Sequence, residues 1–87
     1  MSEARYKEEW YSKKIEALEE DLEFLKAEAM LAEYAICNNV EGYPDYILDA
    51  ARTVQQYVDR KIEAFEEALR DARRSYEYWH DRVLTEE

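Results

Sequence analysis

Gly42 and Pro44 are the only glycine and the only proline in the 87-residue chain, and they stand two residues apart near its middle. Residues that reverse a backbone sharply are therefore confined to one place, which leaves almost no turn chemistry for a β-sheet. Asn38 and Asn39 just before them tolerate the left-handed conformation that ends helices, and Pro44 fits the first turn of a new helix. The sequence predicts a single turn over residues 38–43 and no strands.

Apolar residues before this turn recur with alternating gaps of three and four: Ile15, Leu18, Leu22, Leu25, Ala29, Ala32 and Ile36. Their mean spacing of 3.5 residues is the one that keeps a stripe facing a neighbouring helix, as in coiled coils. Ser2 belongs to the residue types that cap helix N-termini. We predict a first helix over about residues 2–37 with this stripe as its buried seam.

A second stripe follows the turn: Ile47, Ala51, Val54, Val58, Ile62, Phe65, Leu69, Ala72, Tyr76, Trp79 and Val83. Its mean spacing is 3.6 residues, and its one irregularity is a pair of four-residue gaps around Val58. Such a shift unwinds a supercoil slightly, so we expect a nearly straight second helix over about residues 44–84. A third helix, broken off near the β-branched residues of Thr53–Gln56, is the alternative.

So short a connection forces the two helices to lie antiparallel beside each other. The predicted fold class is all-α: residues 1–87 form a single domain, an antiparallel two-helix hairpin that dimerises into a four-helix bundle. A dimer is expected because one core in a chain of this size buries only about 60 to 65% of the unfolded surface. A second apolar line, off the main stripe, supplies the predicted self-association surface: Trp10, Ala17, Phe24 and Leu31. Docking of a different protein, or a broad flank of one apolar face, are the alternatives for this line.

Acidic residues dominate the middle of the chain and give it a net charge of −10. Between residues 16 and 49, ten acidic residues stand against Lys26 alone, and folding of the hairpin gathers them at the turn end. The predicted partner-binding face consists of these acids and three nearby tyrosines: Glu16, Glu19, Glu20, Asp21, Glu23, Glu28, Glu33, Glu41, Asp45, Asp49, Tyr34, Tyr43 and Tyr46. The alternative is that the charge serves only solubility.

Charge and composition also restrict the class of partner. A strongly negative chain disfavours nucleic acid and anionic lipid as direct ligands and favours a protein with a basic surface. No apolar run approaches the roughly 18 residues of a membrane span, and the N-terminus lacks the apolar stretch of a signal peptide. Cys37, the only cysteine, cannot form an internal disulfide. We therefore expect a cytoplasmic protein that binds no membrane.

Glu77 and His80 match the Glu-x-x-His spacing of di-iron bundles, but they flank the predicted stripe instead of lying in it. Only Glu3, Glu8 and Glu9 would lie near enough to complete such a site. No serine or cysteine is placed beside His80 as a nucleophile, and no glycine-rich loop could hold phosphate. The sequence predicts no enzyme activity, no metal and no cofactor.

No family motif covers any stretch of the chain. In size, charge and tyrosine content, the chain resembles the short acidic proteins that phages make to block host defence enzymes, such as anti-CRISPR-like inhibitors and nucleic-acid mimics. The leading hypothesis is a non-enzymatic inhibitor that presents its turn-end carboxylates to a basic groove on a nucleic-acid-handling protein and so excludes DNA or RNA. The alternative is a self-associating helical structural, assembly or adaptor protein.

Overall fold

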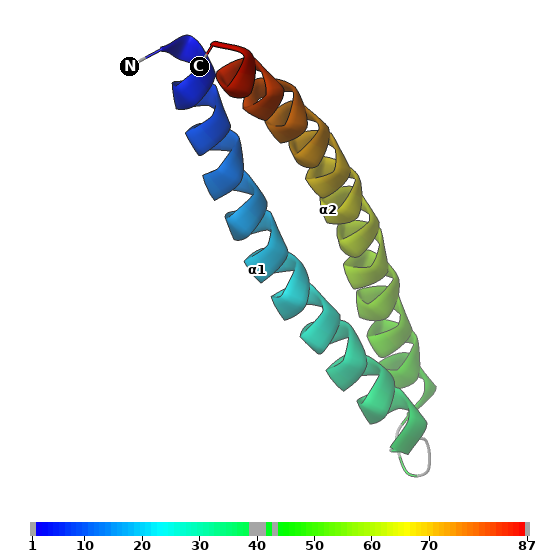
Figure 1. Ribbon diagram of the computed structural model, residues 1–87. Coiled ribbons are helices and arrows are strands. Elements are labelled where there is room, and N and C mark those ends of the chain that lie inside the picture. Colours follow the sequence, from blue (N-terminus) through cyan, green and yellow to red (C-terminus); the bar gives the residue numbers. More distant parts are fainter. Residues whose placement is uncertain (1, 39–41, 43, 87) are drawn as a thin grey trace.

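The computed structural model describes residues 2–38, 42 and 44–86. Two helices make up this part of the chain, α1 over Glu3–Asn38 and α2 over Asp45–Glu86, and no strand occurs among the described residues. The helices run antiparallel, with both ends of the chain at one end of the rod and the connection at the other (Figure 1). The rod measures 65 × 15 × 14 Å. The predicted all-α helical hairpin is confirmed.

Ser2 caps the N-terminus of α1, as predicted. The backbone N–H of Arg5 donates to the Ser2 hydroxyl oxygen at 3.3 Å, and the N–H of Tyr6 donates to the Ser2 carbonyl at 3.2 Å. The Arg5 N–H lies in the first turn, where the helix offers it no backbone acceptor, and the Tyr6 N–H makes the first bond of the helical pattern. The cap therefore fixes where α1 begins.

Gly42 is the described residue that carries the reversal between the helices. Its φ of 99° lies in the left-handed region, which L side chains rarely adopt. Asn38 was expected to begin the turn in such a conformation, but it is the last residue of α1, and no described non-glycine residue has a positive φ. The other residues of the predicted turn lie outside the described part of the chain: Asn39, Val40, Glu41 and Tyr43.

Pro44 lies directly before α2 and not within its first turn. Its carbonyl accepts hydrogen bonds from the N–H groups of Ile47 at 3.0 Å and Leu48 at 3.5 Å. Proline has no N–H of its own to satisfy, so it suits the start of a helix.

The predicted stripe of α1 forms its contact with α2. Every residue of the stripe is buried or half-buried, and Leu22 and Leu25 are the most enclosed, at 8% and 7% exposure. The same alternation of gaps continues toward the N-terminus through three residues that the prediction did not include: Tyr11, Glu8 and Ala4. The seam of α1 is therefore longer than its aliphatic part.

The stripe of α2 differs from the prediction at two positions. Ile47 and Val54, assigned to the core from the sequence, are 38% and 55% exposed, while Leu48 and Gln55 beside them are half-buried. The observed seam alternates gaps of three and four throughout: Leu48, Ala51, Gln55, Val58, Ile62, Phe65, Leu69, Ala72, Tyr76, Trp79 and Val83. The predicted irregularity around Val58 is absent, because a seam that faces one partner helix keeps a spacing of 3.5 even where this places a glutamine in it.

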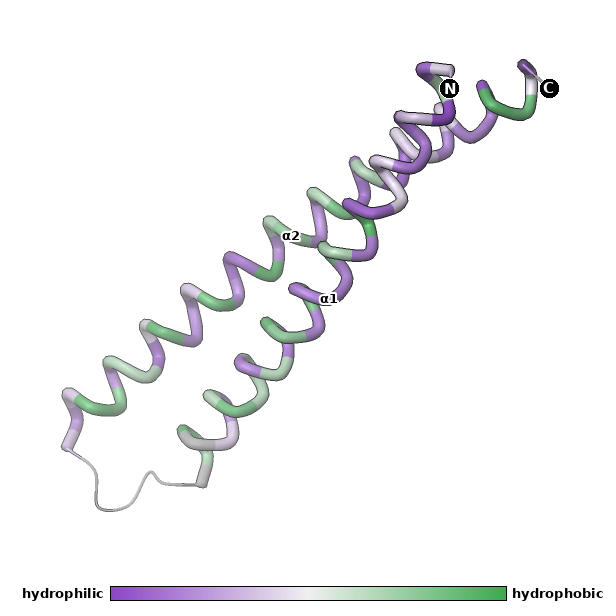
Figure 2. The backbone as a smooth tube through the Cα atoms, turned by 90° about the vertical axis from the view of Figure 1, so that its left-hand side faces the viewer, coloured by the Kyte–Doolittle hydropathy of each residue, from purple (hydrophilic) through white to green (hydrophobic). Residues whose placement is uncertain are grey.

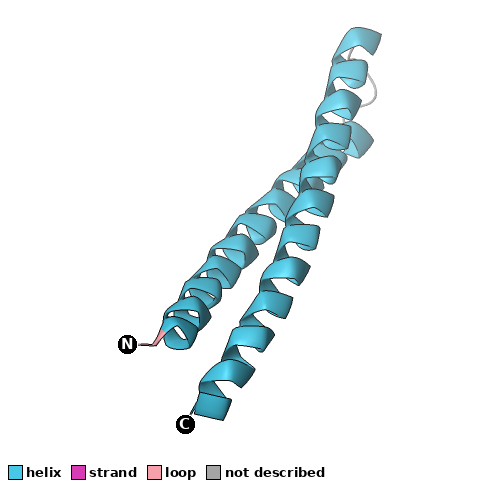
Figure 3. Cartoon of the chain, turned by 90° about the horizontal axis from the view of Figure 1, so that it is seen from above, coloured by secondary structure: helices cyan, strands magenta, loops and turns pink. Residues whose placement is uncertain are grey.

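Helix α2 runs without a break through Thr53–Gln56, so the alternative of a third helix is wrong. The Thr53 hydroxyl donates to the carbonyl of Asp49 at 2.9 Å, one turn earlier in the helix. This bond is a usual way for a threonine to satisfy its hydroxyl inside a helix. Figure 3 shows the two helices from above, and the described residues form no further element that packs against either of them.

The interior between the helices is thin. Among the residues whose burial the structure describes, seven apolar ones are buried: Ala4, Leu22, Leu25, Val58, Leu69, Ala72 and Val83. No described side chain is less than 2% exposed, and hydrophobic positions recur along the whole length of both helices (Figure 2). The accessible surface is 6887 Å², whereas a compact monomer of 10.5 kDa exposes about 5,400 Å². Each helix has one neighbour, and the rest of its surface is open.

Candidate functional site

The seam divides the surface of the hairpin into two sides. A hollow on one side is lined by Asp21, Phe24, Leu25 and Glu28 of α1 and by Lys61 and Phe65 of α2. A hollow on the other side is lined by Leu22 and Lys26 of α1 and by Glu66, Leu69, Arg70 and Arg73 of α2. Leu22 and Leu25 both belong to the seam, so the two hollows lie at its opposite edges. We call these the Phe24 side and the Arg73 side.

Four of the predicted partner-binding residues lie close together on α1, from its Arg73 side to its outer face, and we call this group the acidic ridge: Glu16, Glu19, Glu20 and Glu23. Each lies three or four residues from two of the others, so the four are neighbours on the helix surface, and all four are exposed. Arg73 fixes the side on which the ridge lies, because its Nη2 atom is 3.1 Å from Oε1 of Glu19. The other three carboxylates form no ion pair or hydrogen bond with the described part of the chain.

The remaining predicted acidic residues lie away from the ridge. Asp21 and Glu28 are on the Phe24 side, where they share a hollow with Lys61. Three others are exposed toward the turn: Glu33 on α1, and Asp45 and Asp49 in the first turns of α2. The structure therefore divides the predicted acidic set between the two sides and brings only the four ridge residues into one row.

Of the predicted tyrosines, Tyr34 and Tyr46 are 67% and 73% exposed. Glu41 and Tyr43, the last of the predicted partner-binding residues, lie outside the described part of the chain. The hairpin nonetheless makes the molecule electrically uneven along its length. Residues 16–66, which form the turn end, hold a net charge of −9, and the end with the two termini holds −1.

The predicted self-association line lies on the Phe24 side of α1. Trp10, Ala17, Phe24 and Leu31 recur every seven residues, so they share one line of the helix surface, about 100° around it from the seam residue Leu25. Trp10, Phe24 and Leu31 are 46%, 67% and 70% exposed. Helix α2 therefore leaves this line uncovered.

Three residues of α2 extend this apolar surface onto the second helix. Ile47 and Val54 precede Lys61 by fourteen and seven residues, so they share its line on α2, and Tyr57 lies 5.5 Å from the Lys61 ammonium. Lys61 shares a hollow with Phe24, which places all three on the Phe24 side. We call the combined surface the apolar strip: Trp10, Ala17, Phe24, Leu31, Ile47, Val54 and Tyr57.

The α2 part of the apolar strip is what the sequence reasoning missed. It assigned Ile47 and Val54 to the core, and they are exposed instead. A strict alternation of three and four, carried through Leu48 and Gln55, was the signal that would have found them. The alternation is not visible among the apolar residues alone, because one of its positions is a glutamine, Gln55.

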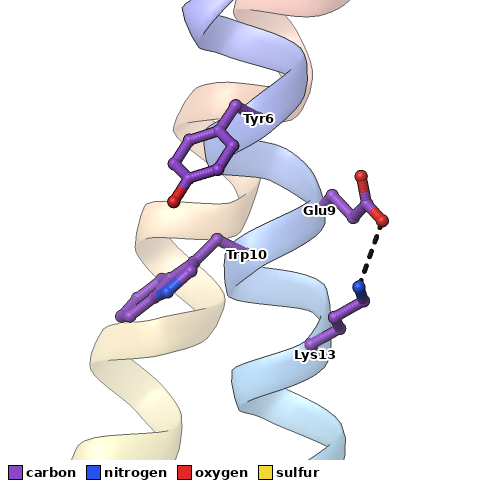
Figure 4. Close-up of a pocket in the computed structure, with 4 residues that line it drawn as sticks. All are labelled: Tyr6, Glu9, Trp10 and Lys13. Carbon is purple, nitrogen blue, oxygen red and sulfur yellow. Dashed lines mark ion pairs between the residues drawn. The ribbon is translucent and has the colours of Figure 1, made fainter.

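Aromatic and basic side chains meet at the end of the apolar strip nearest the chain termini. The Trp10 ring lies edge-on to Tyr11 at 4.8 Å between centroids, and the Lys14 ammonium lies 5.0 Å from the Trp10 ring. Figure 4 shows Tyr6 and Trp10 projecting together from α1, and Glu9 and Lys13, which form an ion pair of 3.2 Å, line the same shallow hollow. The strip thus has cations near Trp10 and carboxylates, Asp21 and Glu28, farther along.

Glu8 and His80 form a polar contact between the helices. The Nδ1 atom of His80 lies 2.7 Å from Oε2 of Glu8, and the His80 ring stacks on Tyr76 with centroids 5.6 Å apart. Glu77, which completes the Glu-x-x-His spacing, is exposed. Within the described residues, no three histidine, cysteine or acidic side chains come together as a metal site would need. The arrangement joins α1 to α2 and offers no set of metal ligands.

No protein-family model, no curated protein and no solved structure matches the chain. Neither helix, over its described residues, has an apolar stretch of the length that a bilayer crossing requires. The two sides of the hairpin are therefore the features from which a function can be argued.

Proposed function

We propose that this chain is a non-enzymatic inhibitor that binds a nucleic-acid-handling protein through the acidic ridge. The observation that carries the proposal is the row of four exposed carboxylates, of which only Glu19 has a cationic partner in the described chain. Like-charge neighbours at this spacing cost a helix about 0.2 to 0.5 kcal/mol per pair. Carboxylates that repel one another and mostly lack a cationic partner within the described part of their own chain are suited to binding the cationic side chains of another protein.

The spacing of the ridge fits a surface made for nucleic acid. Glu16 and Glu23 are seven residues apart, or about 10 Å along the helix, so the mean axial spacing of the four charges is about 3.5 Å. One strand of duplex DNA carries a phosphate every 3.4 Å or so. A basic groove that tracks one strand would therefore meet a similar density of negative charge on the ridge.

Binding would exclude DNA or RNA by competition for this groove. The net charge of −9 at the turn end attracts a basic partner from a distance, which speeds association and makes the affinity fall as salt is added. We place the protein in the cytoplasm, where its exposed Cys37 thiol stays reduced. Size, charge and tyrosine content support the phage-like, anti-CRISPR-like character of this proposal.

The test uses the immobilised protein and a triple variant, Glu16→Gln, Glu20→Gln and Glu23→Gln, which keeps the Glu19 contact with Arg73. Nucleic-acid-handling proteins from a lysate should bind the wild type and be displaced by added duplex DNA. The triple variant should retain at most about a tenth as much, because three contacts with cations are lost.

A matched control removes the same charge from exposed acids of α2 through Asp59→Asn, Asp71→Asn and Glu77→Gln. This control should bind like the wild type. Equal loss in both variants would mean that net charge alone matters, and bound proteins that duplex DNA fails to displace would contradict the mimicry.

A second candidate function is a self-associating helical structural, assembly or adaptor protein, in which the chain dimerises into a four-helix bundle. The apolar strip favours it, since Phe24 and Leu31 are more than two-thirds exposed. Contiguous exposed apolar surface of this kind marks interaction sites. In this case the acidic ridge would serve solubility, and the triple variant would assemble as the wild type does.

A further inference from the structure

We infer that the apolar strip binds a second copy of this chain, with the two α1 helices antiparallel about a twofold axis. This deepens the second candidate function and is independent of the acidic ridge. The first argument is the position of the strip. Trp10 lies seven residues after Glu3, and Leu31 lies seven residues before Asn38, so the line is centred on the midpoint of α1.

Because the line is centred on α1, its residues occupy the same heights along the helix axis when the helix is turned end to end. Placed antiparallel on its copy, α1 overlaps the partner's α1 along its whole length, with Trp10 opposite the partner's Leu31. Ala17 then lies opposite the partner's Phe24, so the largest exposed ring of the central part faces the smallest side chain. Facing large and small residues is the way helix surfaces interdigitate without voids.

Charge also favours a reversed second copy over a parallel one. Parallel rods would place one turn end, with its net charge of −9, against the other. Reversed rods place each turn end beside the end that carries the termini, and Lys14 then lies beside the partner's Glu28. Near the axis Asp21 lies opposite the partner's Glu20, and Lys61, which shares a hollow with Asp21, offsets that repulsion.

The α2 part of the strip has a place in the same arrangement. Val54 and Tyr57 lie toward the turn end of the rod, and they are 55% and 61% exposed. In the reversed pair, that end lies beside the partner's Tyr6 and Trp10, which are 58% and 46% exposed. Aromatic and apolar side chains that have no cover in one hairpin therefore meet each other in the pair.

The excess exposed area of the hairpin is similar to the area that homodimers bury. One hairpin exposes about 1,500 Å² more than a compact chain of its mass, or about 3,000 Å² for two copies. Obligate homodimers bury about 2,000 to 5,000 Å² in total. A second copy on the strip would bring the exposed surface of each chain back toward that of a compact protein.

The first experiment is the mass in solution by light scattering, which needs no knowledge of a target. The wild type should have twice the 10.5 kDa of one chain. Leu31→Ser should weaken dimerisation by about tenfold or more, since a leucine leaves the interface. Met30→Ser is the matched control: Met30 is 71% exposed against 70% for Leu31, but lies about 100° around the helix.

Circular dichroism of both variants should show wild-type helix content, and a dimer that forms equally in both would overturn the inference. A wild type that stays monomeric at about 100 μM would also overturn it. The ridge variant with Glu16→Gln, Glu20→Gln and Glu23→Gln should dimerise as the wild type does. Failure of the ridge proposal and failure of the dimer are thereby separated.

The second experiment tests the antiparallel register by disulfide formation in a Cys37→Ser background. A mixture of Lys14→Cys and Glu28→Cys chains should form the mixed disulfide, and each variant alone should stay largely unlinked. A mixture of Glu16→Cys and Glu23→Cys, at a similar register on the Arg73 side, should not link. Efficient linking of Lys14→Cys or Glu28→Cys to its own copy would indicate a parallel pair and overturn the inference.

Discussion

Glu8 of α1 and His80 of α2 lie 2.7 Å apart, Oε2 to Nδ1, and join the two helices near the ends of the chain. Glu8 occupies a seam position, and its side chain is only 27% exposed, so its loss would leave His80 without its carboxylate partner. The His80 side chain is 45% exposed, and solvent therefore screens part of the interaction. A charge-assisted contact of this kind contributes on the order of 1 kcal/mol.

Replacement of this carboxylate should therefore lower stability. We expect Glu8→Ala to reduce the free energy of unfolding by about 1 kcal/mol, measured by urea denaturation at fixed protein concentration. Glu9→Ala is the control, because Glu9 pairs with Lys13 within α1 and its side chain is 58% exposed. That change should cost about 0.5 kcal/mol or less. Equal losses in the two variants would show that the contact between the helices contributes nothing of its own.

Gln55 offers a prediction about the seam. It is half-buried between Ala51 and Val58 in the stripe of α2, where coiled-coil seams usually carry apolar side chains. Gln55→Leu should raise the free energy of unfolding by about 1 kcal/mol, because apolar area replaces a polar group in the contact. Gln56→Leu, at the exposed neighbouring position, should leave it within about 0.5 kcal/mol. A larger gain at Gln56 would mean that the stripe follows a different line of the helix.

The same residue shows how far the fold could be predicted from the sequence. The aliphatic stripe from Ile15 to Ile36 and the reversal at Gly42 carry strong local signals, and the structure has both. The error at Ile47 and Val54 arose because their apolar side chains are as suitable for a seam as those of Leu48. Only the requirement of a constant 3.5-residue spacing against α1 selects the polar Gln55 over Val54, and that is a property of two helices together.

The candidate surfaces were predictable to a similar degree. The line from Trp10 to Leu31 was visible from its seven-residue repeat, and the structure leaves it exposed. Its continuation onto α2 required knowing which side of the seam Lys61 shares with Phe24. The division of the acids has the same origin, since a count of charges along the chain contains no information on which side of the seam each one lies.

Within the acidic ridge, Glu19 and Glu20 are adjacent in sequence but differ in their surroundings. Glu20 has Glu16 and Glu23 as its helical neighbours and forms no ion pair with the described chain, whereas Glu19 contacts Arg73 at 3.1 Å. Glu20→Gln should therefore raise the free energy of unfolding by about 0.2 to 0.5 kcal/mol at low salt, because it relieves repulsion. Glu19→Gln relieves repulsion too but loses the contact with Arg73, so it should bring no gain.

Salt provides the decisive comparison for this pair. Urea denaturation of the wild type and both variants would be measured at about 0.01 M and about 1 M salt, where charges are screened over roughly 30 Å and 3 Å. The gain from Glu20→Gln should disappear at high salt if it arises from repulsion between carboxylates. A gain that persisted at 1 M would instead reflect the helix propensity of glutamine. A gain of equal size in Glu19→Gln would mean that the contact of Glu19 with Arg73 is too weak to distinguish the two residues, and the ridge would then behave as four equivalent exposed carboxylates.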